Sequence, residues 1–204
     1  MKIIDVEQNS DAWLEARKGK ITGSKLKDLT EKRGGGKKIG YYELIAEKLA
    51  ISPDEEDPRE RGHRLETEAV ELLKEKTGLD FVESGIWVSD EHENIACSPD
   101  CAVLIDGKFK IAGEMKALSS ARHMEAYLTQ EIPDEYEYQK IQYFIVNKDL
   151  EKLYFCFYDP RIPAIPFFYI EVNRSDIEED IKTLTAYQLN LLKEVDEIVN
   201  NLSF

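Results

Sequence analysis

The segment SPDCAVLIDGKFKIAGEMK, residues 98–116, contains a turn signal. Three of its charged residues, Asp100, Glu114 and Lys116, are the starting point for the interpretation of the rest of the chain. Apolar runs lie on both sides of Asp106-Gly107, a dipeptide that predicts a β-hairpin. Successive side chains of a strand point to opposite faces, so Glu114 and Lys116 share one face. Asp100 begins the partner strand, and we therefore expect its carboxylate to reach Glu114.

These three residues suggest a chemistry. Two carboxylates that converge beside an ammonium group are unfavourable unless a cation joins them, and oxygen ligands favour Mg²⁺ or Mn²⁺. Such an ion polarises a phosphoryl oxygen and lowers the pKa of a bound water. A nearby lysine can position or deprotonate that water, or neutralise developing charge. Taken alone, the three residues are better explained as ordinary exposed charges on a hairpin.

Helix and strand signals alternate on both sides of the hairpin. The clearest helix spans residues 61–76, where Leu65, Ala69 and Leu73 recur on one face and Glu66 borders it. We predict further helices over residues 12–18, 22–31, 41–50, 120–128, 134–146 and 173–200, and strands over residues 81–89, 96–98, 101–105, 109–118, 153–158 and 167–172. This order predicts an α/β sheet with a helical N-terminal region. We expect a single domain over residues 1–204.

The charge of the chain is unevenly distributed. The formal net charge is −14, which taken alone disfavours contact with a nucleic-acid backbone. Between Arg17 and Lys48, however, ten basic and four acidic side chains give +6, so the remainder carries −20. A local basic face can hold DNA while an acidic exterior repels it.

Several other classes of protein are disfavoured. No apolar run approaches the ~18 residues of a membrane helix, and the N-terminus lacks the apolar stretch of a signal peptide, so we expect a cytoplasmic protein. The three cysteines have neither zinc-site spacing nor a disulfide pattern. The glycines of residues 34–36 lack the earlier glycine of a phosphate-binding P-loop, and we interpret residues 33–38 as a flexible basic loop. The G-x-S-x-G motif of serine hydrolases is absent.

Further motifs extend the pattern over most of the chain. They are WLEARKGKITGS (residues 13–24), RGHRLE (61–66), CSPD (97–100), EMK (114–116), Gln139-x-x-x-Tyr143 and YDPR (158–161). Gln139-x-x-x-Tyr143, together with Glu66, Asp100 and Glu114-x-Lys116, resembles the extended pattern of RecB-type nucleases. The other motifs, in this order, resemble the lambda exonuclease and YqaJ-type viral recombinase family of PD-(D/E)xK nucleases. The resemblance implies a restriction-endonuclease-like core, with a central mixed β-sheet flanked by helices.

The resemblance also implies roles for individual residues. Glu66, Asp100 and Glu114, with the backbone carbonyl of Met115, would hold Mg²⁺ or Mn²⁺, two ions in each active site. Lys116 would be the catalytic lysine, and Gln139 would hold the water and the lysine in place. Gln142 stays an alternative to Gln139, because this chain has one more residue between its two glutamines than lambda exonuclease has.

A pocket for a 5′-phosphate is implied by the same resemblance. Arg17, Ser24, Ser98 and Arg122 occupy the matching positions, and guanidinium and hydroxyl donors suit a terminal phosphate dianion. We also assign Arg33, in the basic loop, to DNA binding.

The function that the resemblance implies is a Mg²⁺-dependent 5′-to-3′ exonuclease. It would digest one strand of linear double-stranded DNA from a 5′-phosphorylated end, release mononucleotides and leave a 3′ overhang for recombination by single-strand annealing. A homotrimeric ring around DNA, a single-strand annealing protein as partner, and a phage or prophage source in a host cytoplasm are implied as well.

Two alternatives stay open. One is a restriction-like endonuclease of the same fold, which would cut covalently closed circular DNA where an obligate exonuclease would not. The other is an acidic, non-enzymatic binding protein that mimics nucleic acid. That protein would show no metal dependence and would tolerate replacement of Asp100, Glu114 or Lys116.

Overall fold

The computed structural model describes Ala12 and residues 35–49 and 58–202. Apart from Ala12, the helices predicted over residues 12–18 and 22–31 lie outside these ranges. The helices described in full are α3 (Ile39–Leu49), α4 (Pro58–Thr77), α5 (Ser120–Thr129), α6 (Glu137–Val146) and α7 (Glu178–Leu202), with the 3₁₀ turns η1 (Asp134–Tyr136) and η2 (Arg174–Asp176).

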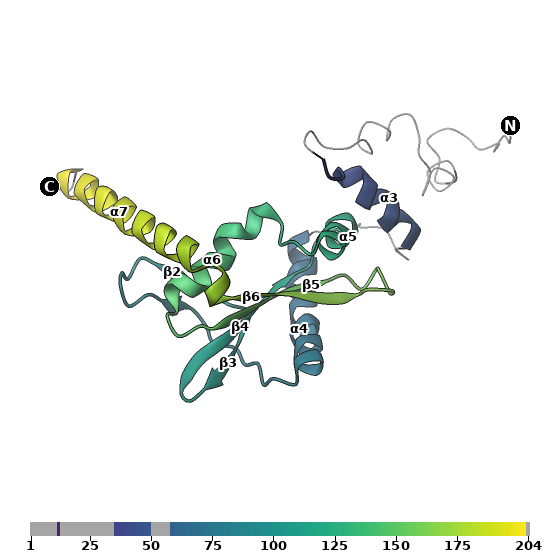
Figure 1. Cartoon of the computed structure of the whole chain (residues 1–204), viewed down its shortest axis with the longest axis horizontal. Helices are drawn as coiled ribbons and strands as arrows, with labels where there is room; N and C mark the ends of the chain where they lie inside the picture. Colours follow the sequence, from purple (N-terminus) through teal and green to yellow (C-terminus); the bar gives the residue numbers. More distant parts are fainter. Residues whose placement is uncertain (1–11, 13–34, 50–57, 203–204) are drawn as a thin grey trace.

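A four-stranded mixed sheet forms the centre of the molecule (Figure 1). Its strands, in spatial order, are β3 (Cys101–Ile105), β4 (Lys108–Lys116), β5 (Lys152–Tyr158) and β6 (Phe167–Asn173). The outer pairs β3–β4 and β5–β6 are antiparallel, whereas β4 and β5 are parallel and are joined by the crossover through α5 and α6. The predicted α/β class with a central mixed sheet is confirmed.

The β3–β4 hairpin forms around the predicted turn. Asp106 and Gly107 both adopt positive φ angles, 52° and 78°, as a two-residue turn between right-handed twisted strands requires. The pairing of Cys101 with Gly113 places Asp100, which directly precedes β3, across from the end of β4 that carries Glu114.

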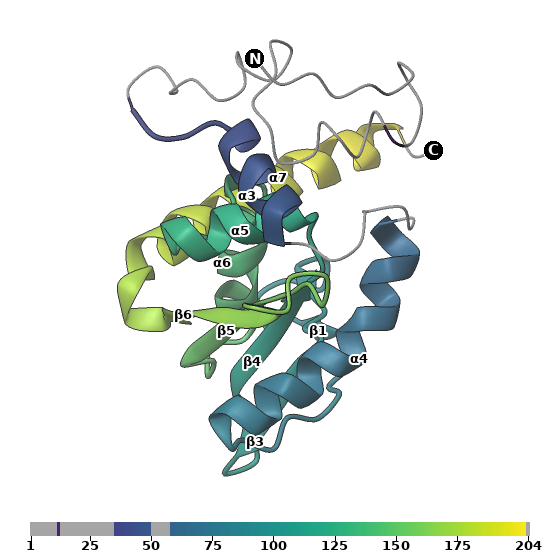
Figure 2. The same ribbon diagram turned by 90° about the vertical axis from the view of Figure 1, so that its right-hand side faces the viewer.

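Helices cover both faces of this sheet (Figure 2). On one face, α4 buries Leu65, Ala69 and Leu73 against side chains of β3, β4 and β5. On the other face, α6 and α7 pack over a second core. Strand β5 serves both cores, because Phe155 and Phe157 enter one and Tyr154 and Cys156 the other, which explains its uninterrupted apolar sequence.

Two predicted elements differ from the structure. The strand predicted over residues 81–89 is reduced to β1 (Trp87–Val88), paired with β2 (Ala96–Cys97), and to an isolated bridge between Val82 and Ala102. Gly85 lies between these two pieces with a φ of +67°, a conformation that interrupts an extended strand. The C-terminal helix predicted from residue 173 begins only at Glu178, after the η2 turn.

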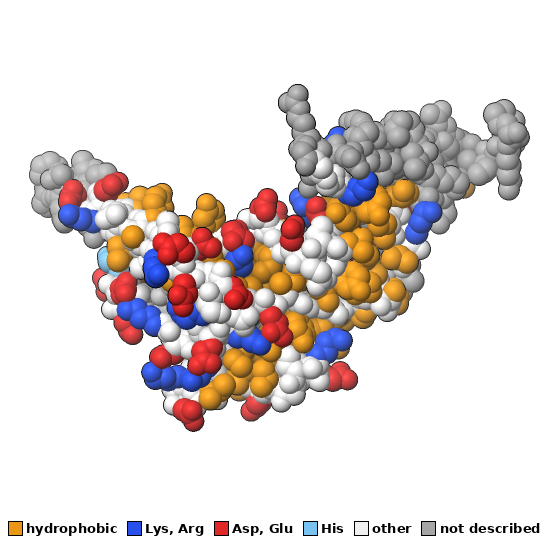
Figure 3. All heavy atoms as spheres, in the orientation of Figure 1, with side chains coloured by type: hydrophobic (Ala, Val, Ile, Leu, Met, Phe, Trp, Pro, Cys, Tyr) orange, Lys and Arg blue, Asp and Glu red, His pale blue; other side chains and the backbone are white. Residues whose placement is uncertain are grey.

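In the described part of the chain, no helix combines the length and the apolar character needed to cross a membrane. On the face drawn in Figure 3, acidic and basic side chains are interspersed, and basic ones lie around α3. Of the predicted basic segment, residues 35–48 are described and residues 17–34 are not.

Candidate active site

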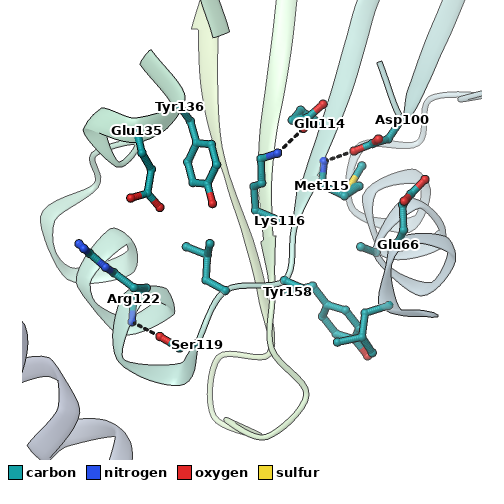
Figure 4. Close-up of a pocket in the computed structure, with 14 residues that line it drawn as sticks. Glu66, Asp100, Glu114, Met115, Lys116, Ser119, Arg122, Glu135, Tyr136 and Tyr158 are labelled. Carbon is teal, nitrogen blue, oxygen red and sulfur yellow. Dashed lines mark hydrogen bonds and ion pairs between the residues drawn. The ribbon is translucent and has the colours of Figure 1, made fainter. Parts of the chain in front are cut away.

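A cavity of about 510 Å³ opens where the C-terminal end of β4 meets α4, the start of α5 and η1 (Figure 4). Four of the residues predicted from the hairpin and its flanking helix line this cavity together. The polar and charged residues around it are Glu66, Asp100, Glu114, Lys116, Ser119, Arg122, Glu135, Tyr136 and Tyr158.

Asp100 lies in a strongly negative environment. Its Oδ2 accepts a hydrogen bond from the backbone amide of Met115 at 2.6 Å. Burial, then the charge of Glu114 and, more weakly, that of Glu66 raise the pKa of Asp100 to about 7. The Met115 amide and the Lys116 ammonium act in the opposite direction without cancelling the increase. The hydrogen bond and the ammonium group near Asp100 therefore do not fully stabilise the ionised form of its carboxylate.

Glu114 is buried, with 3% of its surface exposed, and three side chains hold it. Its Oε1 accepts hydrogen bonds from Nζ of Lys116 at 2.5 Å and from Nε2 of Gln139 at 2.7 Å. Its Oε2 accepts one from the hydroxyl of Tyr143. Burial and the charge of Glu114 raise the pKa of Tyr143, which keeps its hydroxyl protonated and able to donate.

Helix α6 separates the two candidate glutamines. Nε2 of Gln139 donates to Oε1 of Glu114 at 2.7 Å and to the hydroxyl of Tyr143 at 3.3 Å. Gln142 instead exchanges two hydrogen bonds with Gln188 of α7, at 3.1 and 2.8 Å. The geometry favours Gln139 as the glutamine of the site.

The ammonium group of Lys116 is surrounded by aromatic rings. Besides its ion pair with Glu114, Nζ lies 4.7 Å from the centre of the Tyr136 ring and 5.9 Å from that of Phe155. Cation–π attraction to a ring face holds a cation without neutralising it. These contacts hold Lys116 at the wall of the cavity.

The residues predicted to bind a phosphate are only partly described. Arg122 lines the cavity and forms an ion pair with Glu125 at 2.7 Å. Ser98 is exposed and its side chain is not part of the cavity wall; its carbonyl oxygen lies 3.3 Å from the hydroxyl of Tyr143. Arg17, Ser24 and Arg33 lie outside the described residues.

Some residues of the cavity wall were missed by reasoning from the sequence. One of them is Ser119, which lines the cavity together with the predicted Arg122. The hydroxyl of Ser119 accepts the Arg122 amide hydrogen at 3.4 Å as the N-cap of α5. Glu135 and Tyr136 come from η1. A serine directly before a helix was a readable cap signal for Ser119, whereas nothing in the local sequence places η1 beside β4.

The donor set can be tested for its fit to Mg²⁺. Asp100, Glu114 and Glu66 supply oxygen atoms to one cavity. Burial, followed by neighbouring negative charge, raises the pKa of Asp100, and a divalent cation would offset both effects. Over the described ranges, no three His, Cys, Asp or Glu side chains are grouped so that together they could hold a metal ion. Mg²⁺ does not need such a group, because it keeps several waters and is commonly held by one or two carboxylates and substrate phosphates. The residues therefore fit Mg²⁺.

Comparisons with known proteins agree with this geometry. The family model of the YqaJ-like viral recombinase domain matches residues 12–148. The crystal structure of an alkaline exonuclease from Laribacter hongkongensis superposes with a TM-score of 0.61 at 24% sequence identity, covering 95% of this chain and 98% of that one. For the structure of the same exonuclease in complex with dAMP, the TM-score is 0.60 and the identity 23%, with the same coverage. No curated protein sequence matches the chain.

Proposed function

The chain belongs to the YqaJ-like viral recombinase family, and from that premise we propose that it is a Mg²⁺-dependent exonuclease. It degrades one strand of linear double-stranded DNA in the 5′-to-3′ direction from a 5′-phosphorylated end. It releases mononucleotides and leaves a 3′ overhang for recombination by single-strand annealing.

One observation carries this proposal. The carboxylates of Asp100 and Glu114 and the ammonium of Lys116 converge in a single cavity, and Arg122 and Ser119 line the same cavity. The side chains proposed to bind metal ions for phosphodiester cleavage therefore share one cavity with a cationic group and a hydroxyl that suit a phosphate, which supports the proposal. This arrangement is what cleavage close to a phosphorylated end requires.

The proposed mechanism assigns a task to each side chain. Glu66, Asp100 and Glu114, with the Met115 carbonyl, would hold Mg²⁺ or Mn²⁺, and we propose two such ions. When bound, the ions would polarise the scissile phosphate and lower the pKa of water. Lys116 positions the attacking water and neutralises charge that develops on the phosphate.

The other residues hold this arrangement in place. Gln139 and Tyr143 fix both oxygens of Glu114, so that the carboxylate keeps its direction when Lys116 turns toward substrate. Arg122 binds the terminal phosphate, together with Arg17, Ser24 and Ser98 in the proposed pocket. Arg33 contributes to DNA binding.

Product and assembly follow from the same proposal. The Laribacter exonuclease binds dAMP, a mononucleotide, which supports release of mononucleotides here. We propose a homotrimeric ring and a single-strand annealing protein as partner on the resemblance to lambda exonuclease. Light scattering of the purified protein tests the trimer, since a monomer of 23.5 kDa and a trimer differ threefold in mass.

The decisive experiment uses three substrates. Linear duplexes with 5′-phosphate or 5′-hydroxyl ends and a covalently closed circle are incubated with the protein in Mg²⁺ or in EDTA. We expect rapid digestion of the 5′-phosphorylated duplex in Mg²⁺ only, slow digestion of the 5′-hydroxyl duplex and an intact circle. Cleavage of the circle would favour a restriction-like endonuclease, and digestion in EDTA or no digestion at all would contradict the proposal.

A further inference from the structure

The motif Asp159-Pro160-Arg161 has no task in the proposed mechanism, although it directly follows Tyr158 at the edge of the cavity. Neither charged side chain of the motif lines the cavity. Asp159 is fully buried and Arg161 is 9% exposed. A buried ion pair costs free energy to form, so the contacts that this pair makes indicate what it contributes to the protein.

The two side chains form a bidentate pair. Nε and Nη2 of Arg161 donate to the two carboxylate oxygens of Asp159, at 2.7 and 3.0 Å, and the Arg161 amide donates to Oδ1 at 3.1 Å. Burial alone would raise the pKa of Asp159, but the hydrogen bonds from Arg161 and Ser120 and the guanidinium charge lower it. The pair is therefore ionised and rigid in geometry.

This pair holds the segment that follows the catalytic lysine. Nη2 of Arg161 donates to the carbonyl oxygen of Leu118 at 3.3 Å, and Oγ of Ser120 donates to Oδ2 of Asp159 at 2.6 Å. The two contacts lie on either side of Ser119, whose hydroxyl caps α5 and whose side chain lines the cavity.

A third contact ties α5 to the same loop. The buried His123 side chain makes a hydrogen bond to the carbonyl oxygen of Ile165 at 2.8 Å. The neighbouring Arg122 lines the cavity. The loop between β5 and β6 thus contacts the segment from Leu118 to His123 at three points.

We propose that Asp159 and Arg161 are a positioning pair that sets Ser119 and Arg122 in register with Lys116 for a 5′-phosphate. The inference rests on the proposed function and deepens it. The pair touches no substrate; it acts through the backbone of Leu118 and the hydroxyl of Ser120. Its loss shifts the phosphate donors relative to the cleavage site, and misplacement of about 1 Å in such a site costs up to ~100-fold in rate.

The test compares two DNA ends rather than total activity. Arg161→Lys keeps the charge but loses the planar fork, and Asp159→Asn keeps the shape but loses the charge. We measure kcat/KM on duplexes with a 5′-phosphate and a 5′-hydroxyl, together with the folded fraction from circular dichroism. We call kcat/KM on the 5′-phosphate duplex divided by kcat/KM on the 5′-hydroxyl duplex the end-preference ratio. In both variants this ratio is expected to fall about tenfold toward unity. Mg²⁺-dependent digestion of the 5′-hydroxyl duplex is expected to stay within about twofold of wild type.

Two further variants keep the test decisive. Val172→Ala removes buried volume from β6 and lowers stability without touching the pair, so its ratio is expected to equal that of wild type. Ser120→Ala removes only the hydrogen bond from Ser120 to Asp159 and leaves the ion pair intact, so it replaces the charged-pair variants if these fail to fold. We expect its ratio of kcat/KM on the 5′-phosphate duplex to kcat/KM on the 5′-hydroxyl duplex to fall about threefold.

The outcomes separate the two proposals. Folded Arg161→Lys, Asp159→Asn and Ser120→Ala variants that keep the wild-type ratio would overturn the positioning role and leave the exonuclease intact. A fall of the ratio in Val172→Ala as large as in Arg161→Lys would also overturn it, because general destabilisation would then be the cause. Wild-type protein that digests neither duplex contradicts the proposed function itself.

Discussion

Nζ of Lys116 lies 4.7 Å from the centre of the Tyr136 ring, on the wall of the cavity that also contains Asp100 and Glu114. The ion pair between Lys116 and Glu114 must loosen when Glu114 binds a metal ion, whereas the contact of Lys116 with the Tyr136 ring can persist. The ring is therefore suited to hold the ammonium during the reaction.

Replacement of Tyr136 tests this role. We expect Tyr136→Leu to lower kcat on a 5′-phosphorylated duplex about tenfold, because a cation–π contact is worth roughly 1 kcal/mol or more when partly desolvated. Tyr136→Phe keeps the ring face and should retain kcat within about threefold. A Phe variant as impaired as the Leu variant would assign the role to the hydroxyl instead of the ring.

Lys116 itself should be required for cleavage but not for binding. Lys116→Met is expected to lower kcat at least ~100-fold while binding to the duplex in EDTA, measured by gel shift, stays within about threefold. Lys140→Met is the matched control, since Lys140 pairs with Glu137 on α6 and does not line the cavity. Retained cleavage in Lys116→Met would remove this residue from the mechanism.

Gly113 is required by close packing beside the site. A Cβ atom at this position would lie 2.6 Å from Sγ of Cys101 and 3.1 Å from Cδ2 of Leu73. We expect Gly113→Ala to reduce the free energy of unfolding in urea by about 1–3 kcal/mol. Adding Cys101→Ala removes the closest atom, so the double variant should lose less than the sum of the two single variants. Additive losses would show that the clash is not the cause.

Local signals in the sequence were sufficient for the hairpin and for the centre of the site. Asp106-Gly107 sets the turn, and the two-residue period of a strand then places Glu114 and Lys116 on one face. Glu66 reaches the same cavity because Leu65, Ala69 and Leu73 bury the adjacent face of α4. Each of these steps depends on residues that are near one another in the chain.

The features of the site that the sequence did not predict depend on packing between segments that are far apart in the chain. The Gln-x-x-x-Tyr spacing favoured Gln139 but left Gln142 as an alternative. In the structure Gln142 instead contacts Gln188 of α7, 46 residues away in the chain. Likewise, Tyr136 reaches Lys116 only through the crossover that returns the chain to the sheet. The strand predicted around Gly85 failed because backbone conformation there overrode the apolar pattern.

Mg²⁺ should stabilise the folded protein. An ion that binds the native state and not the unfolded chain raises the melting temperature as its concentration rises. Asp100→Asn removes a buried charge but keeps an oxygen for the Met115 amide, so at pH 8 we expect a higher melting temperature without Mg²⁺ than in wild type, and no further increase with it. Differential scanning fluorimetry with and without Mg²⁺ measures both effects. An undiminished Mg²⁺ response in the variant would place the ion elsewhere.

The ion pair of Asp159 should make stability depend on pH in the acid range. The pKa of Asp159 in the folded protein is lowered from its ordinary value near 4, so ionisation stabilises the fold above that pH, and this contribution is lost as the pH falls through the folded pKa. Asp159→Asn lacks the titrating group. We therefore expect the difference in free energy of unfolding between wild type and Asp159→Asn to be constant from pH 5 to 7 and to shrink below about pH 4. Urea unfolding across this range measures the difference, and a gap that stays constant down to pH 3 would show that the charge of Asp159 does not stabilise the fold.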